Sequence, residues 1–171
     1  MAKFPTEVER SVTARVPLAR AYEYLWDVVG SSDCVPGLES CKRVGKDTYQ
    51  FTYQERSTGP VSMVVRYTAR YQGNGIDEIS FEGTTAKGDN TDVSGALRLH
   101  ASGAESTRIT LRQMIAPDTP IPRLLQGLVR SFVEREAADG AQQYLTNIKK
   151  ALEAPLKQSE QSKGQRPKAK G

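Results

Sequence analysis

The stretch VTARVPLARAYEYLWDVV, residues 12–29, contains the change of hydrophobic period that decides the fold. Up to Pro17, apolar and polar residues alternate, and this alternation over Glu7–Val16 predicts a half-buried strand. After Pro17, apolar residues recur at helical spacing as far as Val29, which predicts a helix of about three turns. Arg10 falls on the apolar face of the strand, either at its frayed start or as a charge placed in the interior.

A series of antiparallel strands is expected to follow this helix. Ser31–Gly37 predicts a short irregular or one-turn helical link that ends at a Pro-Gly pair. Beyond it the hydrophobic period is two, and Asn74-Gly75 predicts a two-residue hairpin turn. Sequential strands joined by short turns pair in an antiparallel meander. The strands are expected at residues 38–44, 48–55, 61–71, 76–84, 93–101 and 107–115.

A long helix is expected to close the chain from Pro120 onward. A helix with a single apolar stripe is typical of one that lies on a sheet. Its middle, Ala137–Ala141, presents only small side chains to the buried face, so the helix either approaches the sheet closely or leaves a void. The local sequence does not distinguish these two interpretations. The stripe consists of Leu124, Leu125, Leu128, Val129, Phe132, Ala137, Ala141, Tyr144, Leu145, Ile148 and Leu152.

The order of strand, helix, short link, antiparallel strands and long helix predicts an α+β helix-grip fold. In such a fold a curved antiparallel sheet, here of about six to seven strands, wraps around the C-terminal helix, with one or two short helices after the first strand. Residues 12–27 and the segment VPGLES, residues 35–40, resemble the opening of START/polyketide-cyclase-like (SRPBCC) domains. The Pro-Gly link is similar to that of the CoxG-like group, which is associated with carbon monoxide dehydrogenase. Together with GALRL, TRIT and YLTNI later in the chain, the resemblance covers roughly residues 7–152.

This resemblance implies a cavity between sheet and helix that binds a hydrophobic small molecule such as a lipid, a quinone or a polyketide-like compound. For the CoxG-like group it also implies support of a membrane-associated partner enzyme. The alternative is a polyketide cyclase or dehydratase that uses cavity tyrosines and Arg10. We favour binding over catalysis, because no catalytic constellation is evident in the sequence.

The alternation of the strands also predicts which side chains face the cavity. Tyr53, Tyr67, Arg10 and Gln113 carry polar ends, which either orient a carbonyl or hydroxyl group of the ligand or reach solvent at the rim. The alternative for the set as a whole is a solid core without a ligand. The predicted ligand-binding residues are Arg10, Tyr49, Phe51, Tyr53, Met63, Val65, Tyr67, Leu97, Leu99, Leu111, Gln113, Leu125, Leu128 and Phe132.

No catalytic residue, metal site or cofactor is predicted. His100 is the single histidine and has outward parity on its strand, so we expect it at the surface. Asp27 and Asp33 are interpreted as helix-end or capping residues. Cys34 and Cys41 are expected to be reduced and to act as small apolar residues, in a cytoplasmic setting. No Cys/His cluster, phosphate-binding loop or dinucleotide motif is present in the sequence.

The distribution of charge separates a body from a tail. The 171 residues predict one domain in residues 1–155 and a basic, disordered tail in residues 156–171. The formal net charge of +4 originates in this tail, and the neutral body argues against nucleic-acid binding. The tail either only aids solubility, the interpretation we favour, or contacts an anionic membrane or an acidic protein. No apolar run approaches the roughly 20 residues that span a bilayer, so membrane contact is expected to be peripheral.

Overall fold

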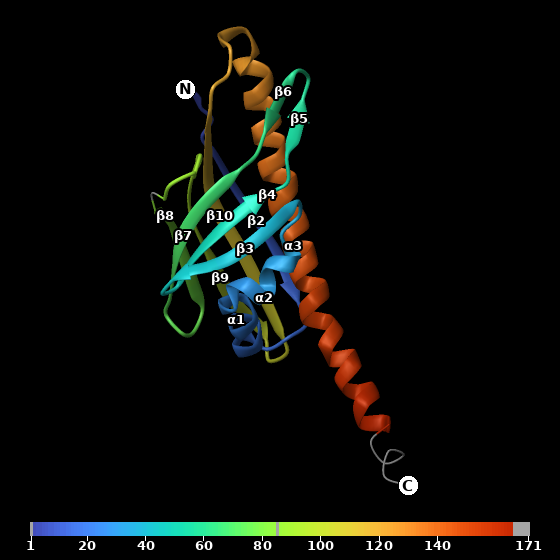
Figure 1. Cartoon of the computed structure of the whole chain (residues 1–171). Helices are drawn as coiled ribbons and strands as arrows, with labels where there is room; N and C mark the ends of the chain where they lie inside the picture. Colours follow the sequence, from blue (N-terminus) through green and yellow to red (C-terminus); the bar gives the residue numbers. More distant parts are fainter. Residues whose placement is uncertain (1, 85, 166–171) are drawn as a thin grey trace.

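The computed structural model describes residues 2–84 and 86–165, and it is built from one large antiparallel sheet and one long helix (Figure 1). The sheet runs in the order β2-β10-β9-β8-β7-β4-β3, and β1 pairs with the far end of β10. A separate hairpin is formed by β5 and β6. The strands are β1 Ala2–Lys3, β2 Thr6–Ala14, β3 Leu38–Gly45, β4 Thr48–Tyr53, β5 Arg56–Thr58, β6 Val61–Met63, β7 Arg66–Gly73, β8 Glu78–Thr84, β9 Thr91–Gly103 and β10 Ser106–Thr119.

The helices complete a helix-grip architecture. In Figure 1, α3 runs along the molecule against the sheet, α1 and α2 lie at one end, and the β5–β6 hairpin lies beside the start of α3. The predicted α+β class, the antiparallel sheet and the long C-terminal helix are therefore confirmed. The helices are α1 Leu18–Trp26, α2 Val28–Ser31, the 3₁₀ helices η1 Ser32–Cys34 and η2 Arg123–Leu125, and α3 Gln126–Gln165.

The first helix is shorter than its hydrophobic spacing suggests, because Asp27 interrupts it. α1 ends at Trp26, and the Asp27 carboxylate accepts a hydrogen bond from the backbone N–H of Gly30 at 3.0 Å. This side chain caps α2, as expected of an aspartate at a helix start. The chain thereby turns into α2 and η1, which lead directly to the sheet.

The strand predicted at residues 48–55 ends at Tyr53, and the strand predicted at residues 61–71 is broken in two between Met63 and Arg66. Beyond Tyr53 and before Arg66 the chain leaves the sheet and forms the β5–β6 hairpin. The hairpin buries Val61 and Met63 in a second hydrophobic cluster with Phe4, Val129 and Val133. Hydrophobic alternation cannot reveal this departure, because strands of the main sheet and strands of the β5–β6 hairpin show the same alternating pattern.

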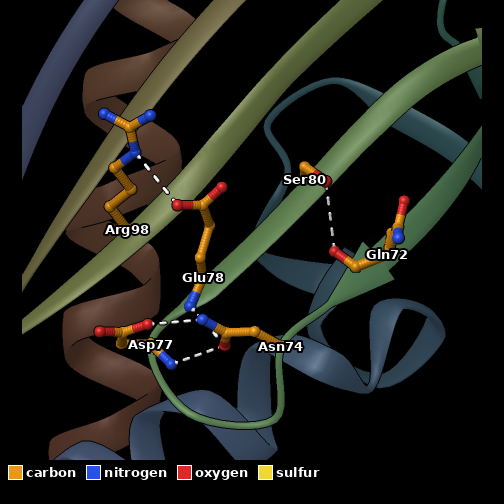
Figure 2. A network of polar contacts seen from close by, with 6 residues as sticks. All are labelled: Gln72, Asn74, Asp77, Glu78, Ser80 and Arg98. Carbon is orange, nitrogen blue, oxygen red and sulfur yellow. Dashed lines mark hydrogen bonds and ion pairs between the residues drawn. The ribbon is translucent and has the colours of Figure 1, made fainter.

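The hairpin at Asn74 is longer than the two-residue turn that the Asn-Gly pair predicts. β8 begins only at Glu78, and the Asn74 side-chain carbonyl accepts hydrogen bonds from the backbone N–H groups of Ile76, Asp77 and Glu78 at 2.9, 2.9 and 3.0 Å. Figure 2 shows Asn74 enclosed by this loop, with its amide donating to Asp77. Gly75 has a φ of 78°, which a side chain would disfavour. The side chain of Asn74 thus organises a longer loop.

Helix α3 packs on the main core through its middle turns, residues 145–152. Leu145, Ile148 and Leu152 are fully buried in the main core. At its N-terminal end the predicted stripe is partly wrong, because Leu124 is 97% exposed and Leu128 43% exposed. Leu124 lies in the short 3₁₀ helix η2 that precedes α3, so the predicted α-helical stripe does not extend to it.

The helix extends past the predicted domain boundary. α3 ends at Gln165, so the boundary at residue 155 falls inside a helix. Residues 166–171 lie outside the described residues, and the disordered tail remains a prediction. Within the described part of the chain, no helix is long and apolar enough to cross a membrane.

Candidate functional site

A partly open cavity of about 480 Å³ lies between the sheet and the middle of α3. This volume is within the usual range for small-molecule sites. The cavity is bounded by β4, β7, β8, β9 and β10 on the sheet side, by α3 opposite, and by the segment from α1 to Gly37 at one end. It therefore occupies the position where a helix-grip fold separates its two layers.

The small residues of α3 leave this space open. Ala137, Gly140 and Ala141 all line the cavity. A Cβ atom built on Gly140 would meet no atom within 4 Å outside its own helical turn. Of the two interpretations of the Ala137–Ala141 segment, the structure therefore supports the void.

Aromatic side chains from β4, β7 and β8 form the opposite wall. Phe51 and Tyr67 are cross-strand partners and stack with ring centroids 5.0 Å apart. Tyr71 and Phe81 stack in the same way at 5.3 Å. Offset stacking stabilises such neighbours beyond the burial of their area. The wall is consequently a continuous apolar surface that flat or extended ligands can contact.

Four tyrosine hydroxyls face the cavity, three from this wall and the fourth, that of Tyr144, from α3. The hydroxyls of Tyr53 and Tyr67 hydrogen-bond each other at 3.2 Å, and Tyr71 and Tyr144 also line the cavity. Burial raises the pKa of Tyr53 and raises that of Tyr67 and Tyr71 well above the ordinary value. Burial likewise raises the pKa of Tyr144. All four phenols are therefore neutral at physiological pH.

The charged residues of the cavity lining, Arg56 on β5 and Glu136 and Asp139 on α3, lie at its solvent-exposed side, which we call the mouth. Arg56 donates to Glu136 on α3 at 3.0 Å, which links the β5–β6 hairpin to the helix. Further along α3, the Asn147 amide donates to the backbone carbonyl of Cys34 at 3.0 Å. Gly37 lines the cavity as well.

Most of the predicted ligand-binding residues meet at this cavity. Those on the main sheet come from alternate positions of their strands, which places their side chains on one face of the sheet. Their role in binding itself stays a prediction. The residues that line the cavity are Phe51, Tyr53, Met63, Val65, Tyr67, Leu97, Leu111, Gln113 and Phe132.

The other predicted residues lie elsewhere. Arg10 is exposed, and its guanidinium donates to the backbone carbonyl of Glu9 at 2.8 Å, because β2 is an edge strand where a long side chain reaches solvent. Tyr49 packs edge-on against Tyr71, outside the cavity lining. Leu99 belongs to the solid core, Leu125 packs on the second hydrophobic cluster, and Leu128 is exposed.

Several cavity residues were not among the predicted ones. Tyr71 follows Tyr67 by four positions in β7, and Tyr144 lies on the predicted apolar stripe of α3, so both carried a periodic signal. The link from Ser31 to Gly37 carried none, because an irregular segment has no period from which to infer direction.

The remaining sequence features have structural roles. His100 is exposed, as expected. Cys34 and Cys41 are both free thiols, and burial raises the pKa of each. The Tyr24 hydroxyl lies 3.4 Å from the Cys34 sulfur. Among residues 2–84 and 86–165, no group of three or more His, Cys, Asp or Glu side chains could hold a metal ion.

Comparison with known proteins shows which solved structures have a similar architecture. No protein-family model matches the sequence, and no curated protein matches it. The Zhui aromatase/cyclase from Streptomyces sp. R1128 has a similar structure, with a TM-score of 0.66 and 17% identity over 86% of this chain and 93% of that one. A START superfamily protein from Mycobacterium smegmatis has a TM-score of 0.62 and 10% identity over 85% of this chain and 96% of that one.

A third similar structure is TTHA0849 from Thermus thermophilus, with a TM-score of 0.63 and 18% identity over 85% of this chain and 96% of that one. Structural similarity at such low sequence identity establishes the fold but not the activity. The chain thus has the helix-grip fold of START and aromatase/cyclase proteins, which confirms the resemblance at that level. The narrower similarity to the CoxG-like group stays a prediction.

Proposed function

We propose that this protein binds a hydrophobic small molecule, such as a lipid or a quinone, in the cavity between the sheet and α3. The observation that carries the proposal is the cavity itself, which is walled by stacked aromatic rings and faced by a glycine and alanines. Transfer of the apolar surface of a ligand from water to such a wall is favourable and stabilises the complex. The similar START and aromatase/cyclase structures support a ligand of this class.

The binding of a neutral fluorescent probe tests this proposal. N-phenyl-1-naphthylamine is uncharged and brightens when it enters an apolar site. Titration into the full-length protein should give saturable binding, and native mass spectrometry should show one probe per chain. Fluorescence that rises linearly without saturation, together with an unliganded mass, would contradict the proposal.

Carrying the ligand to a membrane-associated partner enzyme is the finer part of the same proposal. Its support is the similarity of the Pro-Gly link to the CoxG-like group and the basic tail with Lys157 and Lys163. The carrier role is tested by measuring the rate at which a bound quinone moves from the protein to vesicles, with fluorescence quenching as the signal. Release at the same rate with and without vesicles would oppose a carrier role.

A cyclase or dehydratase activity is the second candidate. Its support is the group of cavity tyrosines and the structural similarity to the Zhui aromatase/cyclase. Arg10 lies outside the cavity, so this hypothesis has to rely on the tyrosines alone. Incubation with a linear aryl β-diketone, followed by absorbance of an aromatic product, tests it, and Tyr53→Phe is the variant expected to slow the reaction.

A further inference from the structure

The four cavity tyrosines approach one another from opposite walls. Tyr53, Tyr67 and Tyr71 extend from β4 and β7, whereas Tyr144 extends from α3. Besides burial, the proximity of Tyr144 and Tyr53 contributes to the raised pKa of Tyr71. All four phenols therefore line the same cavity, and a ligand bound there can contact this tyrosine cluster.

The cluster has more hydrogen-bond donors than the protein uses. Each phenol carries one O–H donor. The Tyr53–Tyr67 hydrogen bond at 3.2 Å uses only one of that pair's two protons. Within the described residues, the hydroxyls of Tyr71 and Tyr144 donate to no protein group, and both half-buried side chains line the partly open cavity, where water reaches their hydroxyls. An acceptor atom on the ligand can take the place of that water.

The charges around the cavity restrict which acceptor fits. Its charged lining residues are Arg56, Glu136 and Asp139, and all three lie at the mouth. Arg56 is already paired with Glu136, which leaves the mouth with the negative charge of Asp139. Gln113, the uncharged polar residue on β10, supplies no countercharge. A buried carboxylate would therefore lack a positive partner, which is strongly unfavourable.

We propose that Tyr53, Tyr67, Tyr71 and Tyr144 form a polar subsite that receives an uncharged acceptor oxygen, such as the carbonyl of a ketone or quinone, and disfavours a free carboxylate. This inference rests on the proposed ligand binding and specifies the ligand class. The apolar part of the molecule lies along the aromatic wall, while its oxygen accepts from the phenols. Free fatty acids are accordingly poor ligands, although they are as lipophilic as the preferred ones.

Three naphthalenes of nearly equal shape separate these contributions. 2-Acetylnaphthalene presents a neutral carbonyl, 2-naphthoate presents a carboxylate, and 2-isopropylnaphthalene has no oxygen. Displacement of N-phenyl-1-naphthylamine at pH 7 gives the affinity of each for the full-length protein. The ketone should bind at least tenfold more tightly than naphthoate.

Tyrosine-to-phenylalanine substitutions then identify the donors. Tyr144→Phe and the double variant Tyr71→Phe/Tyr144→Phe should lower the affinity for the ketone. We expect a loss of about three- to tenfold per hydroxyl, as for the loss of one hydrogen bond. Affinity for 2-isopropylnaphthalene should stay unchanged, which shows that the cavity is intact. Tyr49→Phe, outside the cavity lining, is the matched control and should leave all three affinities as they are.

The outcomes distinguish this inference from the proposed function. If none of the three compounds binds, the cavity is not a lipophilic binding site and both proposals fail. If the compounds bind but naphthoate equals the ketone, the subsite is wrong and ligand binding stands. The subsite is also wrong, and ligand binding still stands, if the phenylalanine variants lower the affinity for the hydrocarbon as much as the affinity for the ketone, or lower neither affinity.

Discussion

Gly140→Leu should make the protein more stable and at the same time a weaker binder. Gly140 lines the cavity, and its Cβ position has no neighbour within 4 Å outside its own helical turn. The four added carbons each need about the space of one water molecule, so they take up on the order of 100 Å³ of the 480 Å³ cavity. Leucine is also the better helix former, by about 0.5–1 kcal/mol.

This substitution is informative because it should raise stability while it lowers ligand affinity. Burial of the new side chain and its helix propensity should raise the free energy of unfolding by about 1 kcal/mol or more. Affinity for N-phenyl-1-naphthylamine should fall at least tenfold, which corresponds to about 1.4 kcal/mol. A general loss of structure cannot imitate this result, because it would lower both quantities.

Gly127→Leu is the matched control for this experiment. Gly127 is also in α3 with no neighbour within 4 Å, but it does not line the cavity. Urea unfolding followed by circular dichroism and fluorescence titration should show a neutral or positive change in stability and unchanged affinity. Equal affinities for the wild type and Gly140→Leu would refute the assignment of the cavity as the binding site.

Three further predictions address the core, the thiols and the tail. Ile148→Ala, at a fully buried position of α3, should lower the free energy of unfolding by about 2–5 kcal/mol, and a loss below about 1 kcal/mol in urea titrations would mean that α3 does not grip the sheet. Cys34 and Cys41 should react with iodoacetamide more slowly than free cysteine at pH 8, because burial raises the pKa of both thiols and lowers their thiolate fraction; equal rates in a mass-spectrometric time course would oppose this. Replacing the basic residues of the tail by glutamine should reduce co-sedimentation with anionic vesicles at low salt if the tail contacts membranes, and unchanged sedimentation would favour a solubilising role. The residues to replace are Lys157, Lys163, Arg166, Lys168 and Lys170.

The fold was predictable because hydrophobic period and element order are local properties of the sequence. The change of period at Pro17 predicted the first strand and helix correctly in kind. Their boundaries were less accurate, because tertiary contacts fix them. Asp27 ends α1 early by capping the next helix, and the Asn74 side chain converts a two-residue turn into a longer loop.

The site was predictable only in part, for a geometric reason. Alternation reports which face of a strand a residue occupies but not where along the strand the cavity lies. Leu97 and Leu99 share a face of β9, yet Leu97 lines the cavity and Leu99 packs in the core with Ile148. The edge position of β2 likewise lets Arg10 reach solvent from an inward-facing register.

The size of the cavity could not be derived from the sequence. It depends on how far α3 stands from the sheet, which is set by residues distant in the chain. Val133 and Val129 anchor the first turns of α3 on the second cluster, and Leu145 anchors the middle of the helix on the main core. The small side chains of Ala137–Ala141 between these anchors leave the space unfilled.

The most direct test of the account is identification of the molecule that the protein carries when purified. Organic extraction of the full-length protein and of Gly140→Leu, purified in parallel, followed by mass spectrometry, gives the identity and the amount per chain. We predict a neutral, carbonyl-containing lipophilic compound that is present with the wild type and depleted in the variant. Equal amounts in both proteins, or a wild-type protein that is empty and takes up no lipophilic compound afterwards, would contradict ligand binding in this cavity.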